Sequence, residues 1–165
     1  MFLSISCCKD KPVEPQLPAL THKGNNTFGC YINGEPFIAK VDFTIAGPIA
    51  VSGSFNEETK LLKIQGTRED DNDNLDNVRF DVYVYDNTNH YDMTAETDHK
   101  VGYLDIGGTN CDYYHDTLNR GNVEITFLDE ENNIISGRFE MDLINPDCSS
   151  STTMHITEGR FDFGY

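Results

Sequence analysis

The sequence contains no tryptophan, few basic residues and no apolar run long enough for a membrane-spanning helix. Lysine and arginine number 12 against 28 aspartates and glutamates, so the formal net charge is −16 at pH 7. Nucleic acids and anionic lipid surfaces attract a basic protein face, and this composition argues against both as partners. The lack of a long apolar run predicts no transmembrane helix. A chain of 165 residues is expected to form one domain.

The sequence also lacks the common motifs of catalytic and metal-binding proteins. It has no Gly-x-Ser-x-Gly elbow and no glycine-rich phosphate loop. Its histidines are scattered, without a His-Glu-x-x-His or His-x-His pair, so no zinc site is expected. Cys111 and His115 would lie about 12 Å apart on an extended strand, too far for a nucleophile and its base. We therefore expect no enzymatic activity and no tightly bound cofactor.

Apolar and polar residues alternate along much of the chain. The clearest case is residues 78–85, where Val78, Phe80, Val82 and Val84 share one face. Polar turns separate such runs, and no convincing helical period occurs. The pattern predicts an all-β fold of about 8 to 10 antiparallel strands. Because an open sheet would expose one face and both edges, we expect a β-sandwich or a rolled, barrel-like meander.

Two runs near the end of the chain, residues 135–143 and 154–165, each contain Gly-Arg-Phe and are expected to form a closing hairpin. In the second run the apolar residues change from even to odd positions. A one-residue slip would expose half of the apolar side chains, so we predict a β-bulge near Glu158 and Gly159. Earlier in the chain, Asn33-Gly34 between two apolar runs predicts a tight hairpin turn.

The start of the chain resembles the end of a secretory signal. Residues 1–8 are interpreted as a signal-peptide remnant, in which small residues precede a cysteine that is diacylated. Cys7 is the first candidate for lipidation and Cys8 the second. Residues 9–22 hold several prolines and are expected to form a flexible tether, and residues 23–165 are expected to form the β domain. Two acyl chains would anchor such a protein stably to the outer membrane.

Three further cysteines would face an oxidising compartment: Cys30, Cys111 and Cys148. An odd number allows at most one internal bridge. We favour Cys111–Cys148, because one lies beside an expected strand and the other in the loop before the last strand. Cys30 lies on an apolar face and is expected to be a buried free thiol. A bridge from Cys30 remains open, because connectivity does not follow from spacing.

Two stretches could contribute to ligand binding. The acidic segment 70–76 places oxygen ligands at Asp71, Asp73 and Asp76, which suggests a weak calcium site. It lacks the turn glycine and the distal glutamate of an EF-hand, so a solvated turn is the favoured interpretation. Aromatic rings of the kind that contact sugars or peptides occur at five tyrosines: Tyr83, Tyr85, Tyr103, Tyr113 and Tyr114. Packing under a second layer is the favoured interpretation for aromatic residues in strands.

Four stretches carry a resemblance to a known family: residues 7–10, 26–34, 135–139 and 156–162. Together with the Pro-rich tether, they resemble a family of small lipoproteins of Bacteroidota that carries a domain of unknown function. The resemblance implies an all-β, membrane-anchored protein exported to the periplasm or the cell surface, and it implies no catalytic residues. The Lys9-Asp10 pair is similar to signals that direct such lipoproteins to the outer face.

We therefore expect a non-enzymatic binding or structural module at the outer membrane, with a protein or glycan partner. The alternatives are a lipocalin-like carrier of a small apolar ligand, an acidic calcium-binding or glycan-binding surface protein, and a hydrolase with two carboxylates about 5 to 10 Å apart. A filled interior favours the module, whereas a large lined cavity favours the carrier. The side chains expected to fill the interior are Phe55, Phe80, Phe127, Phe139, Phe161 and Phe163.

Overall fold

The computed structural model describes residues 16–42, 47–84, 90–92, 103–106, 111–115, 121–148 and 152–165. The described residues form strands and no helix, so the all-β prediction is confirmed. No described segment provides a helix that could cross a membrane. The strands are β1 (Thr27–Ile32), β2 (Glu35–Ile38), β3 (Val51–Asn56), β4 (Leu61–Glu69), β5 (Leu75–Tyr83), β6 (His90–Asp92), β7 (Tyr103–Ile106), β8 (Cys111–Tyr114), β9 (Gly121–Asp129), β10 (Ile134–Ile144) and β11 (Thr153–Gly164).

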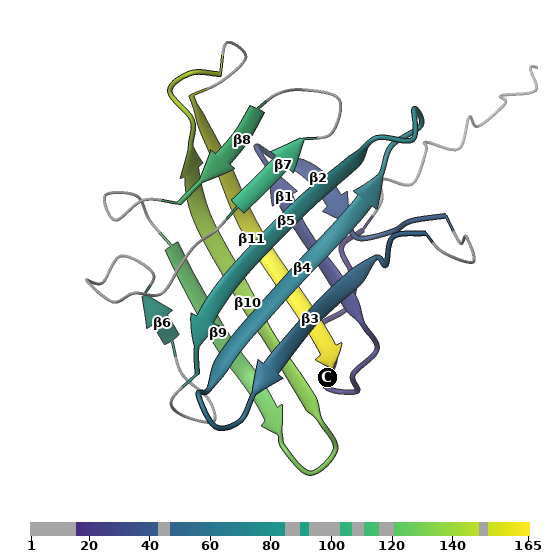
Figure 1. The fold of residues 1–165 in the computed structure, drawn as a ribbon, viewed down its shortest axis with the longest axis vertical. Coiled ribbons are helices and arrows are strands. Elements are labelled where there is room, and N and C mark those ends of the chain that lie inside the picture. The colour runs from purple at the N-terminus through teal and green to yellow at the C-terminus, as the bar shows by residue number, and fades with distance from the viewer. Residues whose placement is uncertain are drawn as a thin grey trace, which may run out of the picture.

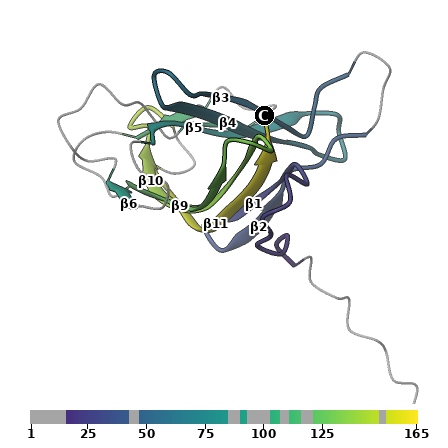
Figure 2. The same cartoon turned by 90° about the horizontal axis from the view of Figure 1, so that it is seen from below.

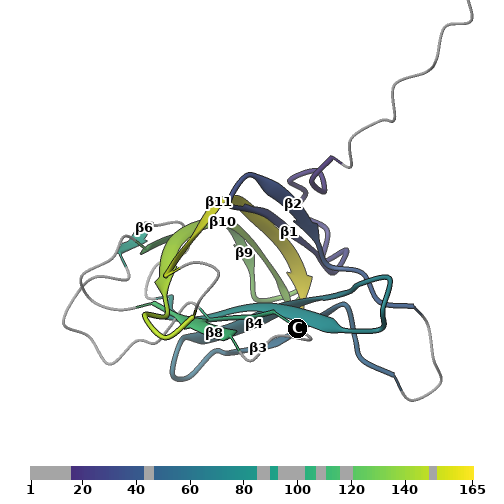
Figure 3. The same cartoon turned by 90° about the horizontal axis from the view of Figure 1, so that it is seen from above.

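The strands form two layers of one antiparallel sheet (Figure 1). A curled layer of β6, β9, β10, β11, β1 and β2 arches over a flatter layer of β8, β7, β5, β4 and β3, as the end-on views in Figure 2 and Figure 3 show. Ile144 of β10 pairs with Tyr114 of β8 at one junction. Lys40 pairs with Arg68 of β4 at the other, through a parallel bridge. The chain is therefore a half-barrel covered by a flatter layer.

Phenylalanine rings fill the space between the layers. The ring of Phe80, from the flatter layer, lies 5.0 Å from the ring of Phe139 and 5.6 Å from that of Phe161, both from the curled layer. Phe28 of β1 lies 4.9 Å from Phe139. All four side chains are buried, so the centre of the fold is a packed aromatic core.

Gly66 of β4 allows Phe28 to reach across this core. A Cβ atom at position 66 would collide with the Phe28 ring. We expect Gly66→Ala to lower the free energy of unfolding by about 2 kcal/mol, because a packed core tolerates added volume poorly. Urea denaturation measures the change. In the double variant Gly66→Ala/Phe28→Leu, the smaller leucine leaves room for the added methyl group, so the loss of stability should be less than the sum of the two single losses. A fully additive loss would contradict the contact between position 66 and the Phe28 ring.

The closing hairpin explains the repeated Gly-Arg-Phe motif. In the antiparallel register, Gly137 pairs with Phe161 and Phe139 pairs with Gly159. Each ring lies over the glycine of the other strand: a Cβ at Gly137 would lie 2.7 Å from the Phe161 ring, and one at Gly159 would lie 2.6 Å from the Phe139 ring. The register shifts beside Glu158, whose φ is 51°. The predicted bulge is confirmed.

The predicted turn at Asn33-Gly34 is also confirmed, because both residues have positive φ, of 50° and 87°. A second bulge was not foreseen. The pairing of β9 with β10 shifts between Ile125 and Phe127, which turns Phe127 to the outer face of the sheet. There its ring stacks on His22 with centroids 4.8 Å apart. The prediction that Phe127 fills the interior is therefore wrong.

The cysteines are arranged as favoured from the sequence. Cys111 and Cys148 form a disulfide with a Cα–Cα distance of 5.7 Å. Cys30 is a free, fully buried thiol packed in the core, and its burial raises its pKa far above the usual value. A buried protonated thiol behaves as a small apolar side chain.

The end of the expected tether is part of the folded domain. Residues 16–26, called here the N-terminal strap, lie against the outer face of the curled layer. Pro18 packs on Gly29, where a Cβ would lie 2.6 Å from the proline ring. Thr21 donates a hydrogen bond to Asp162, and His22 stacks on Phe127. The expected boundary at residue 23 is thus too late, and residues 9–15 of the tether lie outside the described residues.

Candidate functional site

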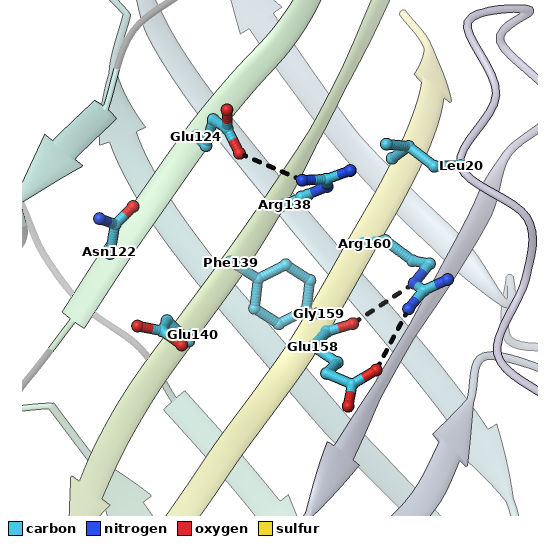
Figure 4. A pocket seen from close by; sticks show the side chains of 9 residues that line it. All are labelled: Leu20, Asn122, Glu124, Arg138, Phe139, Glu140, Glu158, Gly159 and Arg160. Atoms are coloured by element: carbon cyan, nitrogen blue, oxygen red, sulfur yellow. Dashed lines mark hydrogen bonds and ion pairs between the residues drawn. The ribbon is translucent and has the colours of Figure 1, made fainter.

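A groove lies on the outer face of the curled layer, between the N-terminal strap and strands β9, β10 and β11. Its volume is about 420 Å³. Figure 4 shows it from close by. This outer groove is lined by Leu20, Asn122, Glu124, Arg138, Phe139, Glu140, Glu158, Gly159 and Arg160. Most of these side chains are charged, so the groove suits a polar ligand better than an apolar one.

Strand register places the two arginines of the repeated motif side by side. Arg138 pairs with Arg160 on one side and with Glu124 of β9 on the other. Like charges directly opposite each other destabilise an antiparallel pair. The repeat is visible in the sequence, but no role for its arginines was predicted from it. The signal was available, because antiparallel pairing of two copies of one tripeptide sets their middle residues opposite each other.

The carboxylates around the two guanidinium groups hold them loosely. Arg138 Nη1 lies 3.9 Å from Glu124 Oε2, and Arg160 Nη2 lies 3.6 Å from Glu158 Oε2. Both separations exceed a good hydrogen bond. Arg160 also makes long contacts of 3.4 and 3.5 Å with the carbonyl oxygens of Glu158 and Pro18. Arg138 is 62% exposed, so its N–H donors face the open groove.

The strap that borders the groove is fastened by one buried carboxylate. Asp162 of β11 accepts hydrogen bonds from the Thr21 hydroxyl, the backbone N–H groups of Lys23 and Gly24, and the Ser136 hydroxyl. Burial alone would raise the pKa of Asp162, but these hydrogen bonds outweigh burial and hold the pKa below its usual value. Asp162 therefore stays ionised under the strap, and Leu20 is held at the edge of the groove.

The expected calcium ligands do not form a ligand set. Asp71 and Asp73 are exposed in the turn, whereas Asp76 is a buried residue of β5 and pairs with Arg68 at 2.5 Å. Asp70 accepts backbone N–H groups of its own turn. Among the described ranges, no group of three or more His, Cys, Asp or Glu side chains could hold a metal ion. The segment is a turn closed by hydrogen bonds to Asp70, and Asp76 lies beyond it in β5, where it pairs with Arg68.

The described tyrosines among those that could line a ligand surface differ in exposure. Tyr113 is completely buried, Tyr114 is 47% exposed, and Tyr83 is half-buried. Tyr85 and the side chain of Tyr103 lie outside the described part of the chain, as do the lipidation candidates, Cys7 and Cys8. The packing explanation therefore holds for Tyr113.

Comparisons of the chain with protein-family models, with curated proteins and with solved structures find no match. The resemblance to small lipoproteins of Bacteroidota remains an expectation from the sequence. The assignment of a function therefore depends on the fold and on the outer groove.

Proposed function

We propose that this protein is a non-enzymatic binding module held at the outer membrane by an acylated N-terminal cysteine. The observation that carries the proposal is the contrast between the two faces of the curled layer. Its inner face is packed with the rings of Phe28, Phe139 and Phe161. Its outer face carries the open, charged groove. This arrangement fits a protein that binds its ligand on its outer surface better than one that carries a ligand in its interior.

The packed core argues against the lipocalin-like carrier. A carrier of a small apolar ligand needs an apolar cavity inside the barrel. In this fold the rings of Phe28, Phe80 and Phe139 contact one another at the place where such a ligand would lie. The acidic calcium-binding alternative loses support because Asp76 is held by Arg68.

The proposed anchor would hold the groove near the membrane. Seven residues lie between Cys8 and the first described residue, Gln16, and eight extended Cα-to-Cα steps reach at most about 29 Å. Gln16 begins the strap that borders the groove. A module anchored in this way would bind ligands close to the lipid surface.

The anchor is tested by intact-mass spectrometry of the full chain purified from the membranes of its own cell. We expect a mature N-terminus at Cys7 or Cys8 carrying a diacylglycerol group, because two acyl chains are needed for stable anchoring. Cys7→Ser and Cys8→Ser separate the two candidates: the variant of the acylated cysteine should lose the lipid and the other should keep it. An unmodified protein in the soluble fraction would contradict the proposal.

The absence of catalysis is tested separately. The full chain is incubated with neutral and acidic oligosaccharides and with peptides, and the products are analysed by mass spectrometry. We expect every substrate to be recovered intact. Hydrolysis that is lost in the Glu124→Gln or Glu140→Gln variant would contradict the proposal and would favour the hydrolase, since both carboxylates line the groove.

A further inference from the structure

We infer that the outer groove binds a neutral oligosaccharide. The inference rests on the proposed function in one respect, namely that the outer face of the curled layer is the binding surface. It goes further by naming the chemical class of the ligand.

The charges of the groove favour a ligand without net charge. Arg138 and Arg160 stand in one row with Glu124, and Glu140 and Glu158 flank them. An anionic ligand would meet three carboxylates there, and a cationic ligand would meet two guanidinium groups. Such like-charge contacts oppose binding. A neutral ligand avoids both penalties.

The hydrogen-bonding groups of the groove complement hydroxyl groups. Each sugar hydroxyl donates one hydrogen bond and accepts others, guanidinium groups only donate, and ionised carboxylates only accept. Arg138 and Glu124 are 3.9 Å apart at their closest atoms, so neighbouring hydroxyls could bind one to each. Asn122, paired with Glu140 across β9 and β10, adds an amide that both donates and accepts. The Arg138 side chain is 62% exposed, so it loses little when a ligand replaces its long contact with Glu124.

The dimensions of the groove suit a short sugar chain. Residues opposite each other on neighbouring strands have Cβ atoms about 5 Å apart, and the next outward-facing row lies about 7 Å farther along the strand. The polar side chains therefore form a grid with spacings similar to a sugar ring. The volume of about 420 Å³ holds more than one ring. Leu20, on the strap, gives the groove an apolar edge against which the C–H groups of a sugar could pack.

The test uses the full chain in detergent micelles and isothermal titration calorimetry. The probes are neutral oligosaccharides of gluco, manno, galacto and xylo configuration, together with sulfated and uronic-acid oligosaccharides. We expect at least one neutral probe to bind, with a dissociation constant that changes less than about twofold between 0.1 and 0.5 M salt, since no ion pair with the ligand is screened.

Variants locate the site. Arg138→Ala should weaken binding of the neutral probe about tenfold or more, because it removes groove donors. Arg79→Ala is the matched control: Arg79 is an exposed arginine on the outer side of β5, paired with Asp81, and its loss should leave binding unchanged. Circular dichroism and thermal unfolding verify that both variants are folded.

Three results would overturn the inference. They are binding of no neutral probe, binding of acidic probes alone with an affinity that falls as salt rises, and equal weakening by Arg79→Ala and Arg138→Ala. None of them bears on acylation. A protein that is anchored by its cysteine but binds no neutral oligosaccharide would refute this inference and leave the proposed anchor intact.

Discussion

Replacing Asp162 with alanine is expected to lower the free energy of unfolding by about 4 kcal/mol. The carboxylate is completely buried and accepts hydrogen bonds from the Thr21 and Ser136 hydroxyls and from backbone N–H groups of the strap. Its removal leaves the buried Ser136 hydroxyl and the partly buried donors of the strap without this partner, a fully buried donor costing roughly 1 to 3 kcal/mol and water recovering a part for the others. Urea denaturation measures the loss.

A second carboxylate on the same sheet is the control for Asp162→Ala. Asp142 of β10 contacts His155 at 2.8 Å, and the histidine side chain is 58% exposed. Exposed pairs contribute about 0 to 1 kcal/mol, so Asp142→Asn should change stability little. Equal losses in the two variants would contradict the special role of Asp162.

The pH dependence of stability provides an independent check on Asp162. Because the folded protein holds the pKa of Asp162 below its usual value of 3.8, the folded state binds a proton less readily than the unfolded state. The resulting stabilisation is complete well above pH 3.8 and is lost as the pH falls through the folded-state pKa. The stability difference between wild type and Asp162→Ala should therefore be constant near neutral pH and shrink in acid. A constant difference down to the acid limit would contradict this account.

Removing the disulfide is expected to lower the free energy of unfolding by roughly 3 kcal/mol. Cys111 and Cys148 are 37 residues apart, and a cross-link over such a loop restricts the unfolded chain. The double variant Cys111→Ser/Cys148→Ser should show a lower urea midpoint. Added reductant should lower the wild-type midpoint by a similar amount and should leave the double variant unchanged. A wild-type midpoint insensitive to reductant would contradict the bridge.

Local patterns in the sequence predicted the strands and two of the fold's irregular features. Positive φ at Asn33 and Gly34 follows from the turn they form, and the bulge at Glu158 follows from the change of parity in β11. Each of these features depends on residues that are close together in the chain. A short window of sequence therefore contains the information.

Features that depend on distant pairing could not be predicted in this way. Phe127 was assigned to the core because its own strand gives no sign of the shift in register with β10. The strap has no periodicity, and its partner, Asp162, lies about 140 residues away. Asp76 was grouped with the acidic turn because its pairing with Arg68 appears only when β4 and β5 are aligned.

The outer groove belongs to the same class of long-range features. Gly-Arg-Phe was visible as a repeat, but the opposition of Arg138 and Arg160 requires the exact register of β10 and β11. The bulge at Glu158 sets that register. The bulge, which the sequence predicts, therefore sets the register that brings the groove residues together. The groove itself is not predicted from the sequence.

Nuclear magnetic resonance of the arginine Nε–H groups tests the central claim most directly. The full chain in micelles, labelled with nitrogen-15, is titrated with the neutral oligosaccharide that binds best. We predict that the Nε–H signals of Arg138 and Arg160 shift in proportion to the bound fraction, while those of Arg68 and Arg79 stay in place. Shifts confined to Arg68 or Arg79 would show that ligand binds elsewhere and would contradict the outer groove as the binding site.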